Sequence, residues 1–208
     1  TYLQQGKLKL EGTLSDVFPE HFRPGTRIGE LTLMQLLSHT TGLDGNSGLV
    51  SYEEPSRERL LASYAKARFV NAPGSKFGYH NASYNVIAAV IEKASGQSFR
   101  DYMREHVFLP AGMKSTGILG DSWLKQERSI FRSDDPDARS SLDWPCGWGY
   151  LGAGGVVTSV NDLIAFEKAF ATDAIVSEQS KALLLKPIVQ VPEREPGTSY
   201  SMGWFLNT

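Results

Sequence analysis

The chain has 208 residues, of which 41% are hydrophobic and 21% charged, and this balance is typical of a globular domain with a buried core. Its net charge of -2 provides no basic surface field, which argues against nucleic acid as a partner. The single cysteine, Cys146, excludes an internal disulfide, and the longest apolar run, Val86 to Ile91, is far too short to span a membrane.

The first helix signals lie near the start of the chain. Gly6 is expected to close the last turn of a helix. Thr32 and Gln35 then form a capping-box pattern, in which each side chain bonds the other residue's backbone N–H, ahead of leucines that share one face. Gly42 is expected to end this helix, because glycine readily adopts the left-handed conformation found at helix ends.

Two further helices are predicted before residue 97. One runs from Pro55–Ser56 to about Ala67, because two leucines and Tyr64 share one of its faces. Asn81 is expected to cap the next helix, and Gly96 is expected to end it. The side chains expected to face the core from that helix are Tyr84, Ile87, Val90, Ile91 and Ala94.

The second half of the chain contains more helix starts and one predicted strand. Weak alternation predicts a strand from Tyr200 to Leu206. The segment from Gly120 to Trp148 has no clear period and is rich in Asp, Ser and Pro, so a long loop is expected there. The residues expected to cap the helices are Ser98 with Asp101, Thr158 or Ser159, and Ser177.

The triplet Tyr79-His80-Asn81 lies on a turn that leads into a predicted helix. A phenol has an unperturbed pKa near 10, so Tyr79 acts as a base at neutral pH only where nearby ammonium groups stabilise the phenolate. Taken alone, the triplet favours a structural interpretation, in which the tyrosine packs on a turn and the asparagine caps a helix. The sequence around it decides between this interpretation and a catalytic one.

Three segments of the chain carry a resemblance to a known superfamily. They are LTLMQLLSHTTGL at 31–43, the segment 73–116 that contains the triplet, and LGAGGVVTSVNDLIAF at 151–166. In this order and at these spacings they resemble the serine β-lactamase-like superfamily of class C β-lactamases, DD-peptidases and family VIII esterases. The resemblance implies an α+β fold of the β-lactamase/penicillin-binding-protein type. Residues 1–208 would form one partial domain, mostly its helical portion with a few short strands.

The resemblance also implies roles for two residues of the triplet. In the family, the tyrosine of this motif supports proton transfer to and from a serine nucleophile, and the asparagine bonds the substrate amide and a lysine. By that match, Tyr79 and Asn81 are the expected catalytic residues. His80 stands where the family commonly has a small residue, often serine, so a narrower site or an altered local charge is expected.

The family's other two motifs are expected outside this chain. The Ser-x-x-Lys motif that carries the nucleophile would lie before Thr1, and the third motif, Lys-Thr-Gly or His-x-Gly, would lie after Thr208. Two internal Ser-x-x-Lys matches begin at Ser63 and Ser122, but a match of this length is expected by chance in such a chain. In the family, the Lys-Ser-Thr-Gly stretch at 114–117 corresponds to a structural turn.

Other signals favour structural roles. The four histidines show no spacing of a metal site, so neither a metal nor a cofactor is expected. His39 is expected to brace a helix C-terminus, where carbonyl groups favour a cation or donor. The glycine-rich stretch 152–155 lacks the pattern of a phosphate-binding loop, so a close-packed turn is expected.

The resemblance implies a serine hydrolase of the β-lactamase/DD-peptidase/esterase type, which acts through an acyl-enzyme on a small-molecule or peptidoglycan-like acyl substrate. The 208-residue chain by itself is expected to be an inactive fragment. The alternative is a catalytically dead relative that retains the fold as a binding or sensing module. The resemblance favours a periplasmic or secreted location, and the sequence leaves the oligomeric state open.

Overall fold

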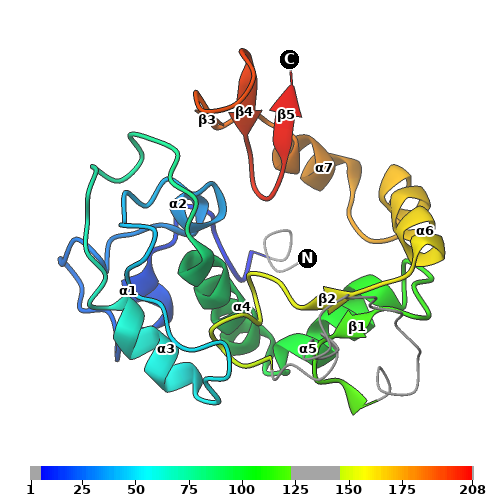
Figure 1. Cartoon of the computed structure of the whole chain (residues 1–208), viewed down its shortest axis with the longest axis horizontal. Helices are drawn as coiled ribbons and strands as arrows, with labels where there is room; N and C mark the ends of the chain where they lie inside the picture. The colour runs from blue at the N-terminus through cyan, green and yellow to red at the C-terminus, as the bar shows by residue number, and fades with distance from the viewer. Residues whose placement is uncertain (1–5, 123–145, 208) are drawn as a thin grey trace, which may run out of the picture.

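The computed structural model describes residues 6–122 and 146–207, and in this part the helices contain far more residues than the strands (Figure 1). The strands are short, with two or three residues each, as predicted for this α+β fold. The predicted loop at 120–148 and the helical turn before Gly6 fall mostly outside the described residues.

The elements are α1 (Leu14–Val17), α2 (Leu33–Leu37), α3 (Arg57–Tyr64), α4 (Asn81–Ser95), α5 (Phe99–Met103), the π-helix η1 (Arg104–Phe108), β1 (Gly117–Ile118), β2 (Val156–Val157), α6 (Val160–Ala171), α7 (Glu178–Leu184), β3 (Val189–Gln190), β4 (Thr198–Tyr200) and β5 (Phe205–Asn207).

Helix α4 lies at the centre of the molecule and contacts α2, α3 and α5 (Figure 1). One apolar cluster packs against it from the side of α1, α2 and α3, with Phe18, Phe22 and Tyr64 among its fully buried side chains. A second cluster, which includes Phe108 and Ile118, packs on the side of α5 and β1. No helix among the described residues is long and apolar enough to cross a membrane.

The buried face of α4 agrees only in part with the prediction. Of the five side chains expected to face the core, Val90 is buried, and Ile87 and Ile91 are partly buried and pack against the two apolar clusters. Two clusters pack on the helix, so its buried arc is broader than a single apolar stripe and includes two polar side chains. The buried residues are Ala82, Ser83, Asn85, Val86, Ala88, Ala89 and Val90.

Most predicted helix starts are confirmed, because a side chain bonds a backbone N–H within three residues. The capping box of Thr32 and Gln35 is present, with both reciprocal hydrogen bonds. Gly96 ends α4 in the left-handed conformation, as predicted, at φ 73°. The other predicted caps that bond their helices are Ser56, Ser98, Ser159 and Ser177.

Three predicted boundaries are wrong. Helix α2 ends at Leu37 and not at Gly42, because the chain turns at His39, whose φ of 55° is left-handed. Helix α3 ends at Tyr64 and not near Ala67. The N-cap of α4 is His80, which makes no side-chain capping bond, and Asn81 is the first residue inside the helix.

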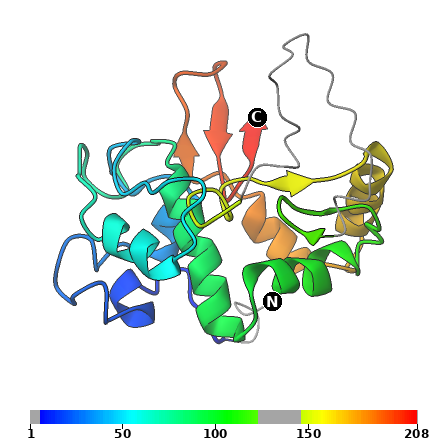
Figure 2. The ribbon, with the colours of Figure 1, turned by 60° about the horizontal axis from the view of Figure 1, so that its bottom comes forward.

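The strands form two small antiparallel sheets. Strand β1 pairs with β2, and β3, β4 and β5 form a second sheet in that order. The single strand predicted from Tyr200 to Leu206 is a hairpin, in which Tyr200 pairs with Phe205 across a turn that contains Gly203 at φ 97°. In Figure 1 and Figure 2 this sheet lies at the N-terminal end of α4.

The glycine-rich stretch 152–155 forms the close-packed turn that the sequence predicts. Asn85, buried in α4, accepts hydrogen bonds from the backbone N–H groups of Gly152 and Ala153, at 3.0 and 2.9 Å. A Cβ atom on Gly152 would overlap the backbone carbonyl of Tyr84, and one on Gly154 would overlap the ring of Tyr150. The turn therefore packs closely against the central helix α4 and is hydrogen-bonded to it.

We expect Gly152→Ala to destabilise the full-length protein by about 1–3 kcal/mol, because the added methyl group has no space against α4. Urea unfolding followed by circular dichroism measures this difference. Gly78→Ala is the matched control, since a Cβ there meets nothing within 4 Å and no left-handed φ is required. Equal stability of the two variants would contradict the close packing at Gly152.

Candidate active site

Tyr79 lies on the extended segment that precedes α4, and its side chain is 54% exposed. Together with Phe77, Arg194 and Phe205 it lines a surface hollow of about 630 Å³. The guanidinium of Arg194 lies over the Phe205 ring, 3.8 Å from its centroid. Tyr79 therefore borders a groove, and its side chain is not enclosed in an apolar core.

Asn81 follows at the first position of α4 and is half-buried. Among the residues that the structure describes, none forms a hydrogen bond with its carboxamide. The Asn81 side chain is therefore available as both a donor and an acceptor at the start of the helix. The structure thus places the two predicted site residues on either side of His80, one on the extended segment and one on the helix.

His80 has its imidazole in the interior and is fully buried. Its Nε2 lies 2.9 Å from the carbonyl oxygen of Ser47, so this nitrogen carries the proton and donates. Its Nδ1 then accepts from the hydroxyl of Ser83 at 2.8 Å, and that hydroxyl also pairs with the Tyr64 hydroxyl at 2.9 Å. Burial lowers the pKa of His80. The expectation that His80 narrows the site or changes its charge is therefore wrong.

His39 contacts two residues of the triplet, Tyr79 and His80. It is 2% exposed, and its ring centroid lies 4.4 Å from that of Tyr79. Its Nδ1 accepts from the backbone N–H of His80 at 3.1 Å. Burial, with a smaller contribution from His80, lowers the pKa of His39 to about 4. His39 therefore lies at the C-terminal end of α2, as predicted, but its ring is a neutral acceptor and not a cation.

Two further tyrosines, Tyr84 and Tyr200, join the β3–β4–β5 sheet to helices α2 and α4 beside this site. The hydroxyl of Tyr84 donates to the carbonyl of Leu37, at the end of α2, at 2.8 Å. That leaves its oxygen to accept from the hydroxyl of Tyr200, which lies 3.2 Å away on β4. Burial raises the pKa of both phenols. The sequence predicts Tyr84 only as a side chain that faces the core, although a buried phenol generally needs a hydrogen-bond partner.

Neither Ser63 nor Ser122, the serines of the two internal Ser-x-x-Lys matches, lines the hollow beside Tyr79. The Ser63 hydroxyl donates to the carbonyl of Leu49 at 3.1 Å, and the partner of Ser122 in its motif lies outside the described residues. In the Lys-Ser-Thr-Gly stretch, the Ser115 N–H and the Thr116 hydroxyl both donate to Asp162, at 2.7 and 2.6 Å. This stretch therefore ties β1 to α6, as a structural turn does.

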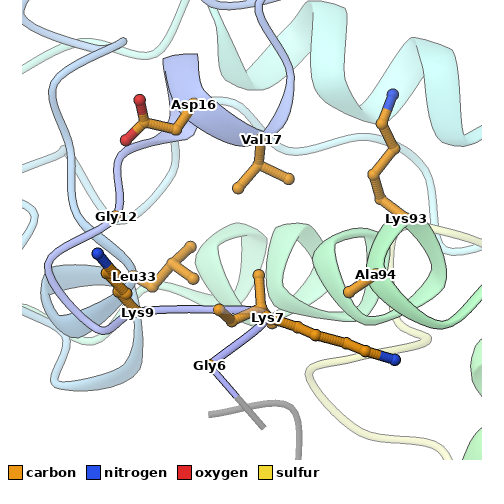
Figure 3. Close-up of a pocket in the computed structure, with 10 residues that line it drawn as sticks. Gly6, Lys7, Lys9, Gly12, Asp16, Val17, Leu33, Lys93 and Ala94 are labelled. Carbon is orange, nitrogen blue, oxygen red and sulfur yellow. The ribbon is translucent and has the colours of Figure 1, made fainter.

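A second hollow, of about 570 Å³, lies at the other end of α4 (Figure 3). Its lining includes Lys93 and Ala94, which are twelve residues or more from Asn81 and so about 18 Å along the helix. The residues that line it include no hydroxyl, thiol or imidazole group. Figure 3 shows Lys7 and Lys93 extending in different directions, so this hollow has no converging catalytic groups.

Comparison with known proteins identifies the family. The sequence model of the Beta-lactamase family matches residues 2–208. The chain belongs to the Beta-lactamase family.

Among the described residues, no group of three His, Cys, Asp or Glu side chains could hold a metal ion.

The relatives in this family include penicillin-binding proteins. The chain is 24% identical to the putative penicillin-binding protein PbpX of Bacillus subtilis, over 98% of this chain and 48% of that protein. It is 27% identical to penicillin-binding protein 4* of the same organism, over 90% of this chain and 45% of that protein. The chain thus spans about half the length of the curated relatives it matches.

Solved structures share the fold. The octameric penicillin-binding protein homologue from Pyrococcus abyssi superposes with a TM-score of 0.77 at 21% identity, over 98% of this chain and 49% of that one. The class C β-lactamase from Rhodobacter sphaeroides superposes with a TM-score of 0.72 at 21% identity, over 98% of this chain and 56% of that one. These superpositions confirm the predicted β-lactamase/penicillin-binding-protein-like fold.

The two buried histidines predict a loss of stability in acid. His39 has a pKa of about 4 when folded and 6.5 as the reference value, so its contribution is complete above pH 6.5. It declines as the pH falls from 6.5 to 4, where the unfolded chain binds the proton and the folded chain does not. By pH 4 the loss attributable to His39 is about 3 kcal/mol.

Urea unfolding of the full-length protein at pH 7 and pH 4.5 tests this expectation. His39→Asn should unfold with a shallower pH dependence than the wild-type protein. His106→Asn, at an exposed histidine, should keep the wild-type dependence. The same pH dependence in all three proteins would rule out a neutral buried His39.

Proposed function

We propose that the protein containing this chain is a serine hydrolase of the β-lactamase, DD-peptidase or esterase type that acts through an acyl-enzyme. The observation that carries the proposal is the arrangement of the triplet. Tyr79 lines a hollow, Asn81 follows two residues later with a carboxamide that no described residue hydrogen-bonds, and the buried His80 ring anchors the backbone between them. In the family, these two positions hold the motif tyrosine and asparagine.

In this mechanism the serine oxygen bonds to the acyl carbon, and the bond to the leaving group breaks. The serine proton passes through the Tyr79 oxygen to the leaving group, and water later regenerates the serine by the reverse route. The serine and its lysine belong to the Ser-x-x-Lys motif, which the family resemblance places ahead of Thr1. The carboxamide of Asn81 would bond the substrate amide and that lysine.

The related proteins favour acyl transfer as the shared chemistry. They include the D-alanyl-D-alanine-carboxypeptidase/endopeptidase AmpH of Escherichia coli, at 23% identity, and the D-aminopeptidase of Brucella anthropi, at 31% over 100 residues. The structure of EstCE1, a hydrolase with promiscuous acyltransferase activity, superposes with a TM-score of 0.75. We therefore propose a small-molecule or peptidoglycan-like acyl compound as the substrate class.

We expect Tyr79→Phe in the full-length protein to slow both acylation and deacylation, because the phenylalanine ring fills the same space and cannot carry a proton. The expected loss is about 10²- to 10⁴-fold, measured by single-turnover kinetics with nitrocefin or p-nitrophenyl acetate. Tyr52→Phe is the matched control, at a tyrosine that is 65% exposed and outside the hollow. Unchanged rates in Tyr79→Phe would refute the catalytic role.

We expect the nucleophile to lie outside residues 1–208. Peptide mapping of the full-length protein after reaction with a fluorophosphonate or a penicillin should therefore place the adduct on a serine outside this segment. Ser63→Ala should be labelled as fully as the wild-type protein, because the Ser63 hydroxyl donates to a backbone carbonyl. The isolated 208-residue chain should not be labelled.

Either of two results would contradict this expectation. A stoichiometric adduct on Ser63 would show that the internal motif is the functional one. A full-length protein that forms no adduct, yet binds acyl compounds, would favour the binding or sensing module over the enzyme.

A further inference from the structure

His39 contacts three successive residues of the segment that carries Tyr79. Its backbone carbonyl accepts from the N–H of Gly78 at 2.8 Å. Its ring lies against the ring of Tyr79, with 4.4 Å between centroids. Its Nδ1 accepts from the N–H of His80 at 3.1 Å. One side chain and its own carbonyl therefore fix the backbone on both sides of Tyr79 and also limit the orientation of the phenol ring.

The backbone of His39 is held in an unusual conformation to make these contacts. Its φ of 55° is the only left-handed value at a non-glycine residue among the described residues. Such conformations persist where the surrounding structure enforces them, and they are concentrated at functional sites. Here both neighbours are hydrogen-bonded, Ser38 to the preceding helix α2 and Thr40 to a distant segment. The Ser38 hydroxyl donates to the Met34 carbonyl, and the Thr40 carbonyl accepts from the N–H of Gly74.

We propose that His39 is a positioning residue, which holds the Tyr79 phenol in the orientation needed for proton transfer. This inference rests on the proposed function and adds a residue to it. His39 does not touch the reacting atoms in this scheme. It acts by fixing the segment 78–80, so that Tyr79 does not lose its alignment with the serine during the reaction. A misplacement of about 1 Å at a reacting group can cost about 100-fold in rate.

The contacts define which protonation state of His39 is required. Because Nδ1 accepts a hydrogen bond, the proton of the neutral ring must be on Nε2. The titratable groups that face the ring are the phenols of Tyr79, Tyr84 and Tyr200, together with His80. Protonation of Nδ1 would remove the acceptor of the His80 N–H and release the segment.

A residue that merely fills the core would behave differently. Its replacement would reduce stability and leave the rate of the folded protein unchanged. His39 instead combines two hydrogen bonds to the Tyr79 segment with a ring contact to Tyr79 itself. Its loss should therefore slow the acylation step in protein that remains folded.

The test compares two variants of the full-length protein that tolerate a left-handed φ. His39→Gly removes both the ring and the acceptor, whereas His39→Asn keeps an acceptor oxygen and loses the ring. We expect the single-turnover acylation rate constant to fall about 10- to 100-fold in His39→Gly and less in His39→Asn. The dissociation constant of the ester or penicillin before acylation should stay within about twofold of the wild-type value.

Phe108→Leu provides a control for loss of stability, since Phe108 is buried in the second apolar cluster and belongs to a different element. It should destabilise the protein and acylate at the wild-type rate. ¹⁵N NMR of the histidine rings at pH 7 provides a readout that does not depend on activity. It should show His39 as the neutral tautomer with its proton on Nε2.

Each outcome decides the question. A folded His39→Gly protein that acylates at the wild-type rate, or that loses only affinity, overturns the positioning role. A protonated His39, or a proton on Nδ1 at pH 7, overturns it independently of activity. A wild-type full-length protein that forms no acyl adduct refutes the proposed function itself, and the inference falls with it.

Discussion

The hydrogen bond from the backbone N–H of His80 to Nδ1 of His39 is the contact on which the geometry of the site depends. It joins the segment after α2 to the residue before α4, across 41 positions of sequence. Because the His80 backbone is extended, at φ -145° and ψ 100°, neighbouring side chains leave it in opposite directions. Because the His80 ring points into the interior, the Tyr79 side chain points toward the surface. Asn81 follows as the first residue of α4.

Polar residues on α4 extend this arrangement to the rest of the molecule. Ser83 holds the His80 ring, Tyr84 bonds both the end of α2 and Tyr200 on β4, and Asn85 bonds the glycine-rich turn. Ser83 thus fixes the residue that caps the helix, while Tyr84 and Asn85 join the helix to three other segments, namely the end of α2, strand β4 and the glycine-rich turn. Buried polar groups of this kind are costly when a partner is lost, so they specify one arrangement of these segments.

The sequence predicts hydrogen bonds between residues close in the chain and misses those between residues far apart in it. The caps at Thr32, Ser98 and Ser177 are predictable because each bonds a backbone N–H three residues away. The roles of His39 and Asn85 are not, because their partners lie 41 and 67 residues away and no local pattern specifies them. The hairpin at 200–206 was predicted as one strand, because its alternating pattern continues through the turn. Tyr79 and Asn81 were identified through the family resemblance and not through their composition or spacing.

The neutral state of both histidines constrains the proposed chemistry. Burial lowers the pKa of His39 and of His80, so neither imidazole supplies positive charge to Tyr79 at neutral pH. A phenol near its ordinary pKa of about 10 needs a nearby cation before it can accept a proton at pH 7. In the proposed mechanism that cation is the lysine of the Ser-x-x-Lys motif. In this mechanism the histidines hold the phenol in place and the lysine supplies the positive charge, so substitution of His39 should change the rate without removing that charge.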